Sequence, residues 1–189
     1  MILSQFQTVG HDLFVRGLVS SHSGNMSIRL GERMIITRRS CHLGCLGEHD
    51  LIETGISRND RNTPLASAEL AVHRAIYQQT PALAVVHAHP PHAVALSLAE
   101  TEIVPSDAEG LEMMGRVPIL GWHTEVRAGG LAVEIAQALK QCRIAMVHGH
   151  GSFATGQLLE DAHNGTTTLE ESCRVICLLK SLAVGQTRQ

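Results

Sequence analysis

The chain has 189 residues, 44% of them hydrophobic and only 3% aromatic, with a formal net charge of −3 at pH 7. This length and composition exclude extensive disorder and predict one α/β domain over residues 1–189 with an aliphatic core. The low aromatic content and the lack of a basic run argue against nucleic acid or a membrane surface as a partner. Neither a membrane-spanning apolar stretch nor a signal peptide is evident, so the sequence predicts a cytoplasmic protein whose five cysteines are free thiols.

Hydrophobic periodicity and turn residues predict alternating helices and strands along the chain. The first part is expected to form a helix over residues 3–19 and then a hairpin of strands 26–30 and 34–37. After a polar loop at 55–64, a helix is expected over 67–78 and a strand over 83–88. The remaining elements are expected to be a helix starting near residue 92, a strand at 117–120, a helix ending near 141, a strand at 143–147 and a helix at 159–182. This order predicts a mixed sheet covered by helices on both faces.

The strand expected at 83–88 leads into the segment His87-Ala88-His89. Side chains two residues apart on a strand point to the same face, so His87 and His89 can hold one metal ion together. Two histidines make half of a zinc site, because zinc usually takes four ligands. A second candidate pair, His148 and His150, follows the strand at 143–147. Both are expected to lie on one face of an extended segment, so their spacing does not separate them.

Five short motifs occur in order over nearly the whole chain. They are Gly24-Asn25-Met26-Ser27, the segment from Ile36-Thr37 through Gly44 to Asp50-Leu51-Ile52, Ser67-Ala68-Glu69 with His73, His87-Ala88-His89, and His150-Gly151 with Gly156. Together they resemble the class II aldolase/adducin family, and within it the fuculose-1-phosphate aldolase type. The fold that this resemblance implies is a three-layer α/β/α arrangement around a mixed, mostly antiparallel central sheet.

The resemblance also implies a metal centre. One Zn2+ per chain would be bound by His87, His89 and His150, with another divalent metal as an alternative. The register of the last motif selects His150 rather than His148. Three protein ligands leave an open coordination position, which is typical of catalytic zinc. The acidic residue of the family corresponds to Glu69, which would move the proton in catalysis.

The phosphate pocket that the resemblance implies would be formed by the loop after Thr37 and by four residues, Gly24, Asn25, Ser67 and Ala68. In that loop this chain has Arg39-Ser40, where phosphate-binding members tend to have Ser-Gly or Thr-Gly. Arginine can pair bidentately with a phosphate or with a carboxylate. Both kinds of anchoring group therefore remain open.

The activity that the resemblance implies is cleavage of a small sugar phosphate, similar to fuculose 1-phosphate, into dihydroxyacetone phosphate and a short aldehyde. The metal would stabilise the enediolate that forms as the carbon–carbon bond breaks. The alternatives are a sugar-phosphate dehydratase or epimerase on the same scaffold and a non-catalytic adducin-like interaction domain. Glu69 disfavours an epimerase, and the three histidines disfavour the interaction domain. The family also implies a homotetramer.

The proton donor departs from the family pattern. Aldolases of the family can use a tyrosine from a neighbouring subunit, but the only tyrosine here, Tyr77, falls within a predicted helix. The region that would carry the donor contains Asp107 and Glu109, which are the candidates to replace it. The sequence leaves the choice between them open.

Overall fold

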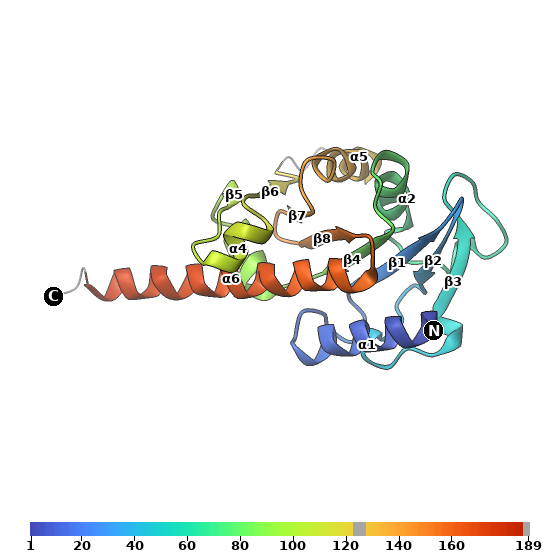
Figure 1. Cartoon of the computed structure of the whole chain (residues 1–189), viewed down its shortest axis with the longest axis horizontal. Coiled ribbons are helices and arrows are strands. Elements are labelled where there is room, and N and C mark those ends of the chain that lie inside the picture. The colour runs from blue at the N-terminus through green and yellow to red at the C-terminus, as the bar shows by residue number, and fades with distance from the viewer. Residues whose placement is uncertain (123–127, 187–189) are drawn as a thin grey trace.

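A sheet of eight strands forms the centre of the structure, a computed structural model that describes residues 1–122 and 128–186 (Figure 1). Its strands are β1 (Asn25–Leu30), β2 (Arg33–Thr37), β3 (Leu51–Gly55), β4 (Ala84–Ala88), β5 (Glu102–Ile103), β6 (Val117–Leu120), β7 (Ile144–Val147) and β8 (Gly151–Gly156). Their order is β3-β2-β1-β4-β8-β7-β6-β5. In this sheet β6 and β7 are parallel and the other neighbours are antiparallel, so the predicted mixed, mostly antiparallel sheet is confirmed.

Helices cover both faces of the sheet (Figure 1). They are α1 (Ile2–Val15), α2 (Leu70–Gln79), α3 (Pro91–Ser97), α4 (Ala108–Met113), α5 (Ala128–Ala138) and α6 (Leu159–Gln186). In Figure 1, α2 and α5 lie above the sheet, while α1 and α6 lie below it. This arrangement confirms the predicted three-layer α/β/α fold. Within the described ranges, no helix is both long and apolar enough to span a bilayer.

Alternate side chains of the central strand β4 point into two different cores. Ala84, Val86 and Ala88 belong to the core shared with α1 and α6. Val85 belongs to the core shared with α2 and α5. The strand period of two places His87 on this second face. The histidine therefore points to the side of the sheet that α2 covers.

Two of the helix boundaries that differ from the sequence prediction have a clear local cause. The first helix ends at Val15 rather than near residue 19, because Gly17 adopts a left-handed conformation with φ +70°. The Leu18 N–H then turns back to donate to the Leu13 carbonyl, at 2.9 Å. The second helix begins at Leu70 rather than at Ser67, since the Ser67 hydroxyl accepts from a following backbone N–H and forms a turn before the helix.

The sequence does not predict β8, and takes Gly156 as the end of a turn. The segment has a single large apolar side chain, Phe153, so it carries little local strand signal. Its pairing with both β4 and β7 makes it a buried central strand. As a result His148 and His150 lie in the turn between β7 and β8, and the prediction that both lie on one face of an extended segment is wrong.

Candidate active site

The three histidines of the predicted metal centre come together where several strands begin or end. His87 lies at the end of β4, and its neighbour across the sheet is Asn25 at the start of β1. On the other side of β4, Ala88 pairs with Ser152 at the start of β8. One ring nitrogen from each of His87, His89 and His150 lies within 4.8 Å of the other two. Antiparallel pairing therefore brings residues far apart in sequence together at one end of the central strands.

The orientation of His87 suits it to bind a metal. Its Nδ1–H donates to the Ser152 carbonyl oxygen at 2.9 Å, which leaves the Nε2 lone pair free. That Nε2 atom is 2.9 Å from Nε2 of His89 and 3.1 Å from Oε2 of Glu69. A lone pair and a carboxylate oxygen that face each other are both acceptors, so a cation between them satisfies both. The donor set therefore fits a divalent metal ion.

Burial keeps two of the three imidazoles uncharged. His87 is buried, and this lowers its pKa to about 3 although Glu69 opposes the shift. Burial and the neighbouring His150 also lower the pKa of His89. His150 is half exposed, and its hydrogen bond with Glu69 raises its pKa. Because a metal binds the neutral imidazole, His87 and His89 are ready to act as ligands at neutral pH.

Glu69, the N-cap residue of α2, joins the histidine cluster to the start of β1. Its Oε1 is 3.1 Å from His150 Nε2, and its Oε2 accepts from Asn25 Nδ2 at 2.7 Å. Burial alone would raise the pKa of Glu69, but the His150 hydrogen bond, the nearby His87 and the Asn25 hydrogen bond lower it to about 2. Since burial keeps His87 neutral, the two hydrogen bonds are the main stabilisation of the anion.

Two glycines allow the backbone to approach the site closely. A Cβ at Gly151 would lie 2.4 Å from the Ala88 carbonyl oxygen and 2.7 Å from the His89 ring. A Cβ at Gly24 would lie 2.9 Å from the His87 carbonyl oxygen, and Gly24 also has φ +78°. A larger residue at either position would displace the strand end that carries the histidines.

The predicted anion-binding residues are divided between two parts of this region. Asn25 contacts Glu69 directly, and Ser67 and Ala68 lie in the turn before it. Arg39 lines a groove of about 650 Å³ together with Ser67 and Ala68. Ser40, with φ 57°, is exposed and its carbonyl oxygen accepts from His22. The groove contains none of the three histidines, so it adjoins the histidine cluster rather than enclosing it.

Three other residues with possible catalytic or ligand chemistry lie outside the cluster. His148 packs its ring against Trp122, with the ring centroids 4.3 Å apart. Asp107 is the N-cap of α4, where its side chain accepts from the Gly110 N–H at 2.8 Å. Tyr77 is 1% exposed in the α2 core. Asp107 therefore caps a helix and Tyr77 fills the core, and neither side chain is hydrogen-bonded to the three histidines.

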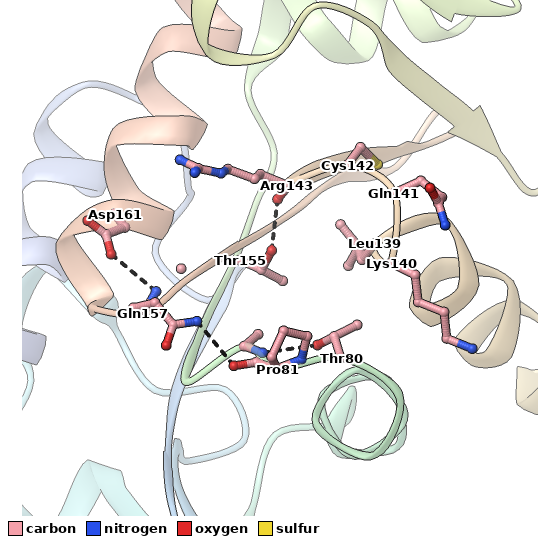
Figure 2. Close-up of a pocket in the computed structure, with 12 residues that line it drawn as sticks. Thr80, Pro81, Leu139, Lys140, Gln141, Cys142, Arg143, Thr155, Gln157 and Asp161 are labelled. Atoms are coloured by element: carbon pink, nitrogen blue, oxygen red, sulfur yellow. Dashed lines mark hydrogen bonds between the residues drawn. The ribbon is translucent and has the colours of Figure 1, made fainter.

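A further hollow of about 510 Å³ lies at the opposite end of β4 and β8 (Figure 2). Its rim includes Gly156, which pairs with Ala84, three residues before His87. This spacing places the hollow roughly 10 Å from the histidine, at about 3.3 Å per strand residue. Polar groups in it bond to one another, as Gln157 does to Asp161 and to the Pro81 carbonyl oxygen. The hollow is thus separate from the histidine cluster.

The fold and the histidine–carboxylate cluster define a protein of the class II aldolase superfamily. Residues 4–177 match the family described as Class II Aldolase and Adducin N-terminal domain, and the chain belongs to this family. The family is typically dependent on a divalent metal, which agrees with the three-histidine group.

The chain is similar to enzymes with different reactions. It is 32% identical over 174 residues to the methylthioribulose-1-phosphate dehydratase of Gluconobacter oxydans, covering 81% of this chain and 80% of that protein. It is 27% identical over 180 residues to the 3-oxo-tetronate 4-phosphate decarboxylase of Pectobacterium atrosepticum, covering 90% and 81%. The crystal structure of L-fuculose-1-phosphate aldolase from Thermus thermophilus superposes with a TM-score of 0.89 and 36% identity, covering 97% and 96% of the two chains.

Proposed function

We propose that the chain is a metal-dependent carbon–carbon lyase that cleaves a small sugar phosphate similar to fuculose 1-phosphate. Dihydroxyacetone phosphate and a short aldehyde would be the products. The observation that carries this proposal is the convergence of Glu69 with His87, His89 and His150 at one end of the central strands. The similarity of nearly the whole chain to L-fuculose-1-phosphate aldolase supports it. Both cores lie against one sheet, which supports a single domain over residues 1–189.

We assign His87, His89 and His150 as ligands of one Zn2+ per chain, with another divalent metal as the alternative. When bound, the ion would supply a Lewis acid for the carbonyl and neighbouring hydroxyl oxygens of the substrate. His150 is the most exposed member of the cluster, with a side chain 46% exposed, whereas the side chain of His87 is only 1% exposed. Substrate would therefore approach from the side of His150.

Glu69 would move the proton at the reacting carbon. In the cleavage direction, the hydroxyl group that becomes the aldehyde loses a proton, and the carbon left on the phosphate-bearing fragment gains one as it becomes the hydroxymethyl carbon of dihydroxyacetone phosphate. Glu69 would deliver the proton to this second carbon. Asn25 holds the Glu69 carboxylate beside the histidines for this transfer. A substrate that displaces Glu69 from His150 would remove one of the hydrogen bonds that lower its pKa. The carboxylate would then be more basic, as general acid–base catalysis requires.

We propose that the anionic end of the substrate is bound next to Glu69. The residues we assign to this role are Gly24, Asn25, Arg39, Ser40, Ser67 and Ala68. The turn that ends in Ser67 and Ala68 precedes α2, and the start of a helix favours an anion. Arg39 adds a positive charge to the groove that these two residues line. A phosphate satisfies both features.

The relatives support a second candidate, a dehydratase or decarboxylase that uses the same metal centre. Zinc-loaded protein should be incubated separately with fuculose 1-phosphate, methylthioribulose 1-phosphate and 3-oxo-tetronate 4-phosphate. We expect dihydroxyacetone phosphate from the first, detected by coupled reduction with glycerol-phosphate dehydrogenase, and no release after chelation of the metal. Loss of water from the second substrate, or of carbon dioxide from the third, without cleavage of the first would replace the aldolase assignment.

We also propose that the chain forms a homotetramer. The carboxyl-terminal part of α6 extends beyond the sheet (Figure 1). It carries Leu178, Leu179 and Leu182 with exposed fractions of 55%, 50% and 66%. Their spacing places them on one side of the helix, and such an apolar row is typical of a protein interface.

Light scattering after size exclusion should therefore give about four times the mass of one chain, as expected for a closed homo-oligomer. The double variant Leu178→Glu/Leu182→Glu should shift the protein to a smaller species, because charged side chains would be placed on the apolar row. Leu158→Glu, at an exposed leucine before α6, is the matched control and should leave the mass unchanged. A monomeric wild-type protein would contradict the assembly.

A further inference from the structure

A row of buried polar side chains extends from Glu69 into the core between β1 and α2. On β1, Asn25 and Ser27 are two residues apart; Glu69, His73 and Tyr77 are four apart along α2 and its cap. Two strand residues and four helix residues both advance about 6 Å, so side chains of the two elements can alternate along the contact. Asn25, Ser27, His73 and Tyr77, which we call the buried polar row, are each no more than 6% exposed.

Each member of the row is hydrogen-bonded to the next. The four contacts are Tyr77 Oη to Ser27 Oγ at 2.7 Å, Ser27 Oγ to His73 Nδ1 at 2.6 Å, His73 Nε2 to Asn25 Oδ1 at 2.6 Å, and Asn25 Nδ2 to Glu69 Oε2 at 2.7 Å. The row thus forms a continuous path from the only tyrosine to the carboxylate of the site.

The chemistry of the groups fixes the direction of every bond. An ionised carboxylate only accepts, so the Asn25 NH2 group must face Glu69 and its Oδ1 must face His73. The His73 Nε2 atom therefore carries the proton. Burial lowers the pKa of His73 to about 4, so the ring is neutral and its Nδ1 accepts from Ser27. Ser27 then has no hydrogen left for Tyr77, whose hydroxyl must be the donor. All four bonds point toward Glu69.

We propose that His73 is a positioning residue for Glu69. By donating to Asn25 Oδ1, it holds the Asn25 amide with its NH2 group toward Glu69 Oε2, and so keeps the carboxylate beside His87 and His150. The proposal rests on the proposed function for the catalytic role of Glu69. Hydrogen bonds aligned in one direction in a dry core strengthen one another, which favours a single orientation of the amide.

The alternative is that the buried polar row only anchors α2 to the sheet. Its bonds would then contribute to the stability of the fold without affecting Glu69. The two roles differ in what a substitution changes. Loss of anchoring lowers stability and activity together, whereas loss of positioning lowers kcat in a protein that is still folded.

The kinetic test compares His73→Asn with His73→Gln in the zinc-loaded protein. The glutamine amide reaches the position of Nε2 and can donate to Asn25, whereas the asparagine amide reaches only the position of Nδ1. We expect His73→Asn to lower kcat for fuculose 1-phosphate by about 10- to 100-fold with little change in KM, because a shift of about 1 Å can cost as much. His73→Gln should recover most of this loss at a similar melting temperature. Ile76→Val, a buried α2 position outside the row, should lower the melting temperature without lowering kcat.

A folded His73→Asn protein with wild-type kcat would overturn the proposal, as would equal loss of kcat in the asparagine and glutamine variants.

A second measurement is independent of the substrate. The 15N and 1H resonances of the histidine rings should show His73 with its proton on Nε2. The resonances of the His73 Nε2–H group should shift in Glu69→Ala, which removes the acceptor at the end of the row. It should not shift in Glu170→Ala, which removes a carboxylate bound to His92 instead. A proton on Nδ1, or no response to Glu69→Ala, would overturn the proposal even if the wild-type protein is shown to be an aldolase. If no substrate is cleaved, the proposed function fails and this measurement still tests the positioning.

Discussion

The variant His87→Ala should lose its divalent metal. His87 is the most buried of the three proposed ligands, and its Nε2 atom lies within hydrogen-bond distance of both His89 and Glu69. Removing even a partner of a metal ligand usually costs about 10- to 100-fold in metal affinity. Removing the ligand itself should cost at least that much. Zinc content by atomic emission should therefore fall from about one ion per chain to near zero, and lyase activity should fall with it.

The matched control is His148→Ala. This histidine lies in the same β7–β8 turn as His150 but packs against Trp122. Its loss should leave the metal content unchanged, and His150→Ala should resemble His87→Ala. Because His87 is buried against Phe153, with ring centroids 4.3 Å apart, circular dichroism must show that the variant is folded. If folded His87→Ala and His150→Ala proteins bind zinc as the wild type does, the metal site lies elsewhere.

The variant Glu69→Gln should keep most of its metal but lose most of its turnover. The amide has nearly the shape of the carboxylate, and its oxygen can still accept from Asn25. It cannot take up a proton, so the general acid–base contribution disappears. That contribution is typically about 100- to 10,000-fold, and we expect kcat to decrease by a factor in this range. The assay is release of dihydroxyacetone phosphate, with zinc measured on the same sample.

Glu170→Gln provides the comparison for Glu69→Gln. Glu170 is also a carboxylate paired with a histidine, since its Oε1 is 2.7 Å from His92 Nδ1, but it belongs to α6 and caps the start of α3. The Glu170→Gln variant should have a lower melting temperature than the wild type but a kcat within about twofold of it, as expected for a residue that contacts no reacting group. Full turnover by metal-loaded Glu69→Gln would remove Glu69 from the mechanism.

Much of the candidate site could be predicted from sequence because its motifs are short and local. His87 and His89 follow an apolar strand, and a period of two is enough to place them together. The choice of His150 over His148 came from the family register, and the structure brings His150 into the cluster while His148 contacts Trp122. The link between the histidines and Glu69 came from the same resemblance, since no local pattern connects positions so far apart.

The buried polar row had a weaker signal that sequence reasoning missed. Glu69, His73 and Tyr77 recur every four residues, which places them on one side of a helix. Asn25 and Ser27 recur every two, which places them on one side of a strand. Nothing in either pattern says that these two sides meet, because that depends on how α2 packs on the sheet.

The amino-acid pattern predicted a mixed sheet covered by helices, and most of the helices and strands, because these follow from periodicities of two and 3.6 residues. The residue types able to bind a metal are read directly from the sequence. It did not fix β8, whose residues have little strand preference of their own and become a strand by pairing with β4 and β7. Nor did it fix the hydrogen bonds that hold Glu69, since these join β1 to α2 across more than 40 residues of chain. Contacts of this kind depend on long-range pairing and packing, which no local stretch of sequence encodes.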